Sequence, residues 1–371
     1  MTNTQTLVLN GKVTAVSPLA VGRPKDDFGE KLEPTRLPRA GAKAEKTPVY
    51  FPGSTLSGTL RRACRDLVRE ATALATGDEK PFSIDVHYML TQGVDTSSNG
   101  GTNQNPSLGF IFSERDLRSV NPMLSLFGRW KMPGHLSISD MTPNEPNEKC
   151  VFIHGQGVRT EDFSRDPSQM AFIKPDEMER LKKILVDDHA KQAEIREEKA
   201  KQQALGRQLR DAAGDGEKAS IKDQLNKLEG KIARLENDKE GSKTSIQHLM
   251  KGYEAIIPGT EMDHKFVLSN ATDIEIGLFI DTLLRFSEKP FLGAHFRNGC
   301  GEVRAEWDVM TRKPGALRSE TIGRVALSFG EFELEDYTDD KVLEKSFEVW
   351  QNAKQDIKAA GLDFTKFLYS D

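Results

Sequence analysis

The sequence lacks the residue pairings that would cross-link the chain or hold a metal ion. Its three cysteines, Cys64, Cys150 and Cys300, are far apart and form no CxxC pair. This spacing argues against a disulfide framework or a zinc site and fits a reducing compartment. The histidines are scattered without an HExxH motif, and no GxSxG nucleophile elbow occurs. We therefore expect no metal, no cofactor and no catalytic group of these kinds.

Long apolar runs and an excess of positive charge are also missing. No stretch reaches the ~18 apolar residues of a membrane span, and "MTNTQTLVLNGK" at the start has no apolar signal core. The formal net charge is −5, so any surface that binds nucleic acid must be a local basic patch. We expect a soluble cytoplasmic protein without a membrane partner.

The composition, 37% hydrophobic and 29% charged, requires one unusually polar segment, which is found at 176–240. This segment has no proline and reads as helical on both sides of "GDG" at 214–216. Its second half repeats apolar residues at the alternating spacing of a coiled-coil seam: Ile221, Leu225, Leu228, Ile232 and Leu235. The pattern predicts an antiparallel coiled-coil hairpin. Its role is open between a solvated structural arm and an arm that docks a specific partner.

The rest of the chain alternates predicted strands and helices. "TLVLNGKVTAV" at 6–16 alternates apolar and polar residues, as a half-buried strand does. A helix is expected at 54–76 with Ser54 as N-cap, and another begins at Thr272 with Glu275 in capping-box spacing and runs to about Ser287. Loops are expected at 17–49 and 91–107, and a helix is expected that is capped by Ser113 and ended by Gly128. Strands are expected in "HLSISDM", in "GYEAIIPGTEMDHKFVLSN" and after "FLGAHFRNGCG". Residues 320–371 are expected to hold a strand pair and a terminal helix.

The order of the core elements predicts the fold class. Strand, helix, strand, strand, helix, strand is the split βαβ order of ferredoxin-like proteins and of RNA-recognition modules. We therefore expect an α+β protein with this core, interrupted by the helical hairpin.

The stretch "YFPGSTLSGTLRRACR" predicts an anion site at a helix N-terminus. Unpaired backbone N–H groups and the helix dipole favour a negative ligand there. The hydroxyls of Ser54, Thr55 and Ser57 add donors, and Gly58 permits close approach. Four arginines follow on the same helix: Arg61, Arg62, Arg65 and Arg69. The alternative is an ordinary capped amphipathic helix with a solvated arginine face.

A second anion site is predicted in "HFRNGCGEVR", where Arg297, Asn298 and Gly299 make a basic glycine loop. Such a loop before a strand is also a common simple turn. Two such elements in one chain favour a phosphate-rich polymer over a nucleotide, because the acidic metal cluster that a triphosphate needs does not accompany either of them.

The clustered carboxylates of the first long loop leave one enzymatic alternative open. Asp26, Asp27, Glu30 and Glu33 lie close together in the sequence near basic residues. A loop cluster of this kind is usually solvated surface. The alternative is a metal-assisted or acid–base nuclease.

Four motifs in the same order resemble the RAMP superfamily of CRISPR systems. "YFPGSTLSGTLRRACR" is similar to the family's PGSS signature, and "LFG" followed by "LSISDM" is similar to its next block. "VRTEDFSRDPSQMAFI" and "HLMKGYEAIIPGTEMDHKFVL" resemble the thumb on either side of the hairpin, and "FLGAHFRNGCGEVRAEW" resembles the glycine-rich loop. The similarity is to the backbone subunit, the seventh CRISPR-associated family, and most to its type IV branch.

The resemblance implies a hand-shaped molecule with a modified RNA-recognition palm, a finger region and a thumb. The first half of the palm with the fingers would span 1–140, the thumb 141–258, and the second half of the palm with the C-terminal elements 259–371. The hairpin at 176–240 would be an insertion in the thumb. The chain would bind guide RNA and polymerise along it in an effector ribonucleoprotein that pairs with target nucleic acid in antiviral defence.

The resemblance also assigns the RNA contacts. Guide phosphates would meet Ser54, Thr55, Ser57, Arg61, Arg62, Arg65, Arg159, Arg297, Asn298 and Gly299. Met170 and Phe172 of the thumb would wedge between bases, which suits apolar side chains because they unstack any base. In the type III branch an aspartate of the first loop cuts target RNA, whereas here the matching stretch offers Glu33, with Asp26 and Asp27 upstream. We therefore expect a scaffold that is not an enzyme, with a metal-dependent ribonuclease as the alternative.

The partners implied are the guide crRNA, a complementary DNA or RNA target, and further copies of the chain. Other effector subunits are also implied, namely a cap subunit, a crRNA-processing subunit and a large or small subunit, with a helicase as a possible addition. A coiled-coil adaptor without any ligand is the remaining alternative.

Overall fold

The computed structural model describes residues 4–21, 36–39, 47–94, 115–129, 132–159, 194–209, 215–237, 248–312 and 315–366. Within these ranges, side chains are not described at 156–159, 215, 217, 219, 236–237 and 248–251. The chain divides into two compact units. The first combines Met1–Gly155 with Lys251–Asp371, and the second is Gln156–Met250.

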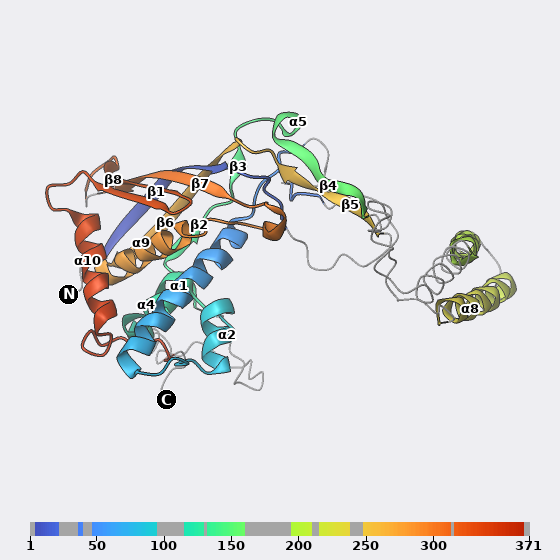
Figure 1. Ribbon diagram of the computed structural model, residues 1–371, viewed down its shortest axis with the longest axis horizontal. Helices are drawn as coiled ribbons and strands as arrows, with labels where there is room; N and C mark the ends of the chain where they lie inside the picture. Colours follow the sequence, from blue (N-terminus) through green and yellow to red (C-terminus); the bar gives the residue numbers. More distant parts are fainter. Residues whose placement is uncertain are drawn as a thin grey trace, which may run out of the picture. The chain divides into compact units, whose positions relative to one another are not determined.

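The first unit is a mixed α/β structure built on an antiparallel sheet (Figure 1). The spatial order of its strands is β2-β6-β1-β7-β8-β9, and β3 also pairs with β6. The strands are β1 (Thr4–Ala15), β2 (Leu136–Ile138), β3 (Thr142–Pro143), β6 (Glu261–Thr272), β7 (Val303–Thr311), β8 (Glu320–Ser328) and β9 (Glu331–Asp336). The strand predicted at 6–16 is thus confirmed as β1, which lies between β6 and β7.

The sheet has one buried and one solvent-facing side, because its strands alternate apolar and polar residues. In β6, Met262, Phe266 and Leu268 are buried while Glu261, Asp263 and Lys265 between them are exposed. On the buried side lie α1 (Gly53–Thr76), α9 (Asp273–Ser287) and α10 (Val342–Gln355), as Figure 1 shows.

A hydrogen bond between side chains of β6 and β7 passes over Gly11 of β1, the strand that lies between them. Gly11 pairs with His264 on one side and with Trp307 on the other. The indole N–H of Trp307 donates to Nδ1 of His264 at 3.1 Å. A Cβ at Gly11 would lie 2.0 Å from the carbonyl oxygen of Glu306, so no larger residue fits between the two strands. Burial lowers the pKa of His264 to about 4, so the imidazole is neutral in the folded protein.

Local signals set the ends of several helices as expected. Thr272 accepts the backbone N–H of Glu275, whose carboxylate accepts the N–H of Thr272 at 2.7 Å, which confirms the capping box. The helix it begins, α9, ends at Ser287 as predicted. The predicted strand in "HLSISDM" is β2, and the strand pair and terminal helix near the C-terminus are β8, β9 and α10.

Other local predictions were wrong. Ser54 does not cap α1, because the helix begins at Gly53 with Pro52 at the N-cap and without a side-chain cap. The expected helix 113–128 is broken: residues 115–120 are helical, and α4 (Pro122–Phe127) starts again after Asn121, whose side chain accepts the N–H of Leu124. Gly128 ends α4 as predicted.

Two further helices of the first unit had not been anticipated. They are α2 (Ile84–Gln92) and the short α5 (Asn147–Cys150). Their sequences are brief, so their apolar periodicity is weak. Helix α2 extends into the loop expected at 91–107, of which only 91–94 are described.

In the second unit, residues 194–209 are helical and α8 spans Asp215–Asn237. The turn expected at 214–216 is displaced, since Gly216 already belongs to α8. Of the predicted seam, Ile221 and Ile232 are buried and Leu225, Leu228 and Leu235 are half-buried. Strands β4 (Val151–Arg159) and β5 (His248–Ile256) form a separate two-stranded sheet.

Among the described residues, none of the helices is long and apolar enough to span a membrane.

Candidate nucleic-acid interface

The entry of α1, predicted to be an anion site, is partly occupied by the protein itself. The N–H of Gly53 donates to Asp140 Oδ1 at 2.8 Å, and the N–H of Thr55 donates to the carbonyl of Pro52 at 3.0 Å. A carboxylate therefore already satisfies the positive end of the helix dipole. Ser54 is exposed and Ser57 half-buried, so their hydroxyls remain the donors available to a ligand at this turn.

Arg61 has a structural position that differs from its predicted role. Its side chain is buried, with 8% exposed, and it donates to three main-chain carbonyls. These are Leu90 at 2.6 Å, Met89 at 2.9 Å and Phe127 at 3.3 Å, at the C-terminal ends of α2 and α4. A cation there stabilises both helix ends. Burial lowers the pKa of Arg61 to about 10, and the guanidinium is still charged at neutral pH. This arrangement does not favour a phosphate contact.

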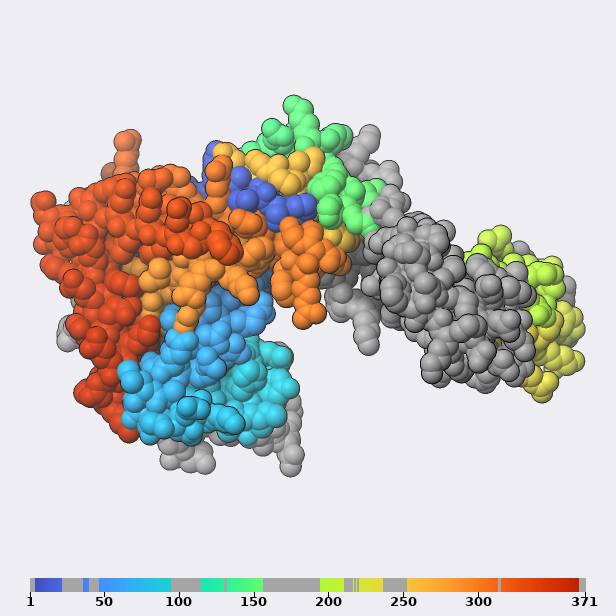
Figure 2. Space-filling view, viewed as in Figure 1, coloured from blue at the N-terminus to red at the C-terminus, as the bar shows by residue number. Residues whose placement is uncertain are grey.

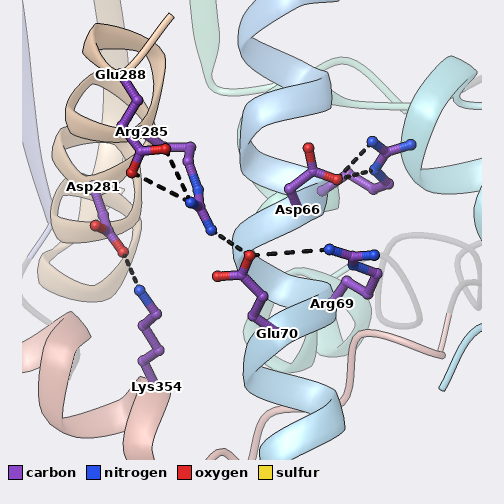
Figure 3. A network of polar contacts seen from close by, with 8 residues as sticks. Asp66, Arg69, Glu70, Asp281, Arg285, Glu288 and Lys354 are labelled. Carbon is purple, nitrogen blue, oxygen red and sulfur yellow. Dashed lines mark hydrogen bonds and ion pairs between the residues drawn. The ribbon is translucent and has the colours of Figure 1, made fainter. Parts of the chain in front are cut away.

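The other arginines of α1 differ in the partners they already have. Arg65 donates to Asp66 at 2.6 Å, and Arg69 lies 4.0 Å from Glu70. Figure 3 shows that Glu70 also faces Arg285 of α9, so the positive charges of this part of α1 are compensated by acid. Arg62 is exposed and donates to the hydroxyl of Thr59 at 3.1 Å. It is the arginine of α1 that is best placed to meet a phosphate.

The predicted glycine loop contains a short 3₁₀ helix, η2 (Phe296–Asn298), whose residues are all exposed. His295 before it and Gly299 after it both have positive φ, 62° and 77°. A non-glycine residue in this region is uncommon and strained. Arg297 and Asn298 thus lie exposed in a tight turn, and their anion-binding role stays a prediction.

The segments that hold the two predicted anion sites approach each other at Gly293 and Phe51. A Cβ at Gly293 would be 2.1 Å from the carbonyl oxygen of Ala20 and 3.1 Å from Cζ of Phe51, the residue that precedes the Pro52-Gly53 turn. Gly293 thus permits the loop to contact the entry of α1. Figure 1 and Figure 2 show the orange loop segment beside the blue start of α1. We refer to Ser54, Ser57, Arg62 and residues 295–299 together as the loop surface.

An aromatic cluster packs against His295 of the loop surface. The ring of His295 stacks on Tyr253 with centroids 3.9 Å apart and planes 4° from parallel. His154 meets the same tyrosine edge-on at 5.6 Å, and the Tyr253 hydroxyl lies 3.3 Å from Cys300 Sγ. Burial, with a contribution from His154, lowers the pKa of His295. The sequence alone did not reveal this cluster because its members lie far apart in the chain. The signal that could have pointed to it is the adjacent pair of aromatic residues, His295 and Phe296, in the glycine loop.

Several predicted site residues fall outside the described structure. Asp26, Asp27 and Glu33 lie outside it, and so do the thumb residues Met170 and Phe172. Arg159 lies in β4, but its side chain is not among those described. Within the described residues, no group of three or more His, Cys, Asp or Glu side chains is placed to hold a metal ion.

The three cysteines are buried and free. Burial raises the pKa of Cys64 to about 12, so this thiol is inert at neutral pH.

The solvent side of the sheet is acidic. It carries an open groove of about 680 Å³, lined on β1, β6, β7, β8 and β9. The charged residues of the groove are Lys12, Glu261, Asp263, Arg304, Glu306, Asp308, Glu331 and Glu333. No aromatic residue lines it. RNA-recognition modules bind bases on aromatics of this sheet face, so the face lacks the chemistry of that binding mode.

No protein-family model matches the sequence, and no curated protein matches it at a significant level. Among solved structures, a chain described as "Type IV-B CRISPR Complex" aligns over 85% of this chain and 93% of its own length. The two share 15% sequence identity, with a TM-score of 0.39. A score of this size does not establish a common fold, so the function proposed below rests on residues and contacts of this chain.

Proposed function

We propose that this chain is a guide-RNA-binding backbone subunit of a CRISPR effector ribonucleoprotein. The observation that carries the proposal is the close approach of Gly293 to the ring of Phe51, since a Cβ at Gly293 would lie 3.1 Å from Cζ of Phe51. It brings together the two segments whose motifs resemble the RAMP signature and its glycine-rich loop, although they are far apart in the sequence. Segments that jointly bind one polymer must be neighbours in space, whereas two unrelated turns need not be.

The topology supports the palm assignment. In chain order β1, α1, β2, β6, α9 and β7 follow the split βαβ pattern, and the four strands lie in the order β2-β6-β1-β7. This order is the one expected of a ferredoxin-like core, and it supports the proposal that these elements form an RNA-recognition palm. Unlike those modules, this palm would use its loop surface for RNA, since its sheet face is acidic.

Each exposed residue of the loop surface has a proposed role. Arg62 and Arg297 bind guide phosphates, and Ser54, Ser57 and Asn298 donate hydrogen bonds to them. Arg61 holds α2 and α4 against α1 and thereby positions this helix. Arg159, Met170 and Phe172 keep their proposed thumb roles, with the last two as wedges between bases. Sequence is then read by Watson–Crick pairing between guide and target and not by the protein.

The helical insertion is proposed to be an antiparallel coiled-coil hairpin. Lys231 of α8 donates to Glu198 at 2.9 Å and lies 3.6 Å from Glu194, and Gln202 donates to Glu229 at 3.2 Å. The pairs run in opposite directions along the two helices, as in an antiparallel pair. We propose that this arm braces neighbouring copies or docks another effector subunit or a helicase.

Co-expression with a candidate guide tests the proposed function. The purified protein should elute as a multimer with an absorbance ratio typical of RNA, and sequencing should recover the guide. Elution as an RNA-free monomer under the same conditions would contradict the proposal. It would favour an adaptor without a nucleic-acid ligand.

A further inference from the structure

Phe296 exposes an aromatic ring on the loop surface. Its side chain is 57% exposed, and its neighbours Arg297 and Asn298 are also exposed. Leaving a phenylalanine in water forgoes about 1.5–3 kcal/mol relative to burying it. A single exposed ring is ordinary in itself. The ring of Phe296 is distinguished by the hydrogen-bonded main chain of the loop that carries it and by the positive charge of Arg297 close to it.

The loop that carries Phe296 is fixed by main-chain hydrogen bonds. The N–H of Ala294 donates to Ala20 at 2.9 Å, that of Leu292 to Gly301 at 2.8 Å, and that of Gly301 to Pro18 at 2.9 Å. These bonds hold both ends of the loop on the palm. The main chain of the loop is therefore constrained before binding, which lowers the conformational entropy that binding costs.

His295 adds a second constraint and stores strain. Its φ of 62° is disfavoured for a residue with a side chain, and the stack on Tyr253 keeps it there. Strain of this kind persists where the surrounding contacts over-determine the backbone, which is common at ligand sites. The effect is to turn the next residue, Phe296, away from the core.

The charge beside the ring defines the ligand chemistry. The guanidinium carbon of Arg297 lies 5.8 Å from the centroid of the Phe296 ring. Because this guanidinium lies over the ring, the ring and the cation together fit a ligand that has a flat ring next to an anion, and a nucleotide has both groups. Stacking on an aromatic side chain does not depend on the base, because every base has a π face.

We propose that Phe296 is a stacking platform for one base of single-stranded RNA, with Arg297 neutralising the adjacent phosphate. The inference rests on the proposed function and identifies the base-contacting residue of the loop surface. Base–aromatic stacking is worth roughly 1–3 kcal/mol per base, so loss of the ring should weaken binding about 5- to 150-fold.

The test compares two ligands of equal charge with the full-length protein. One is a single-stranded oligoribonucleotide, and the other is an abasic ribose-phosphate oligomer of the same length, both measured by fluorescence anisotropy at one salt concentration. Phe296→Ala should weaken binding of the normal RNA by the factor above and leave binding of the abasic oligomer unchanged. Phe296→Trp should restore binding of the normal RNA.

Two other variants are controls for the test. Tyr337→Ala removes an equally exposed aromatic, 56% exposed, from the end of β9 and should change neither affinity. Arg297→Ala should weaken binding of both oligomers, since it acts on phosphate.

The outcomes separate this inference from the proposed function. Wild-type protein that binds neither oligomer overturns both. Wild-type binding that Phe296→Ala leaves unchanged overturns the stacking platform alone. Equal loss on both oligomers shows that the ring only supports the loop, and loss of multimers without loss of RNA binding shows a contact with a protein. Either result also overturns the platform.

Discussion

The solvent face of the sheet and the loop surface belong to the same compact unit and carry opposite chemistry. The sheet face has six carboxylates around its groove, against Lys12 and Arg304, and no aromatic residue. The loop surface carries Arg62, Arg297 and the exposed ring of Phe296. A net charge of −5 conceals this separation. An acidic face repels a phosphate polymer and a basic one attracts it, which is the basis for proposing the loop surface as the RNA contact.

The largest expected effect distinguishes buried from exposed arginine on α1. Arg61→Ala removes three hydrogen bonds to carbonyls at two helix ends, and we expect it to lower the free energy of unfolding by about 3 kcal/mol. Arg62→Ala, one residue along, should change it by less than about 0.5 kcal/mol. Urea unfolding followed by circular dichroism measures both. Equal stability of the two variants would remove the structural role given to Arg61.

The second effect concerns the stability that the protein loses at acidic pH because His264 is buried. The pKa of His264 is about 4 in the folded protein and near 6.5 in an unfolded chain. Between these values the unfolded chain binds more protons, so the free energy of unfolding falls as the pH falls. At pH 5 the loss is on the order of 2 kcal/mol. His264→Asn, which keeps an acceptor for Trp307, should flatten the stability profile between pH 7 and pH 5. An unchanged slope would show that another group titrates.

The third effect compares cations on the two surfaces. Arg62→Ala/Arg297→Ala should reduce RNA affinity roughly tenfold or more and lower the slope of log K against log salt by about 0.7 for each lost phosphate contact. The control pair is Arg304 of the groove and Arg324 of β8, which pairs with Glu306 of the groove at 2.9 Å. Arg304→Ala/Arg324→Ala should leave the slope unchanged. If both double variants lowered the slope of log K against log salt equally, the loop surface would not be the preferred contact of RNA.

The smallest effect comes from neutralising the acidic face. Glu306→Gln/Glu333→Gln should raise RNA affinity by less than about twofold, because exposed charges more than a Debye length away are screened at physiological salt. Binding measured at low and at physiological salt checks the direction and its screening. A large gain would mean that RNA passes over the sheet.

Sequence reasoning was most successful where the signal lies between near neighbours in the chain. The alternation in β1, the capping box at Thr272 and the stop at Gly128 all depend on contacts within a few residues. It failed where a distant group intervened. Asp140 accepts the N–H of Gly53 at the start of α1, where Ser54 was expected to be the cap. Asn121 caps α4 and thereby divides a segment that the sequence predicted to be one helix.

For the candidate site, the residue types could be read from the sequence but their availability could not. The sequence places Arg61, Arg62 and Arg65 on one helix but does not show which partners each of them has. In the structure they are respectively buried against carbonyls, exposed, and paired with Asp66. The residues at 26, 27, 33, 170 and 172 lie outside the described structure, so their roles stay predictions.

The sequence by itself determined the order of the core strands and of α1 and α9, the polar helical insertion and the two glycine- and arginine-bearing segments. These depend on side-chain periodicity, caps and turn residues, which act over short distances along the chain. Only the tertiary structure decided that Gly293 meets Phe51, that His295 stacks on Tyr253 and that the carboxylates gather on one face. The reason is physical: pairing β1 with both β6 and β7 brings together residues that no local rule relates.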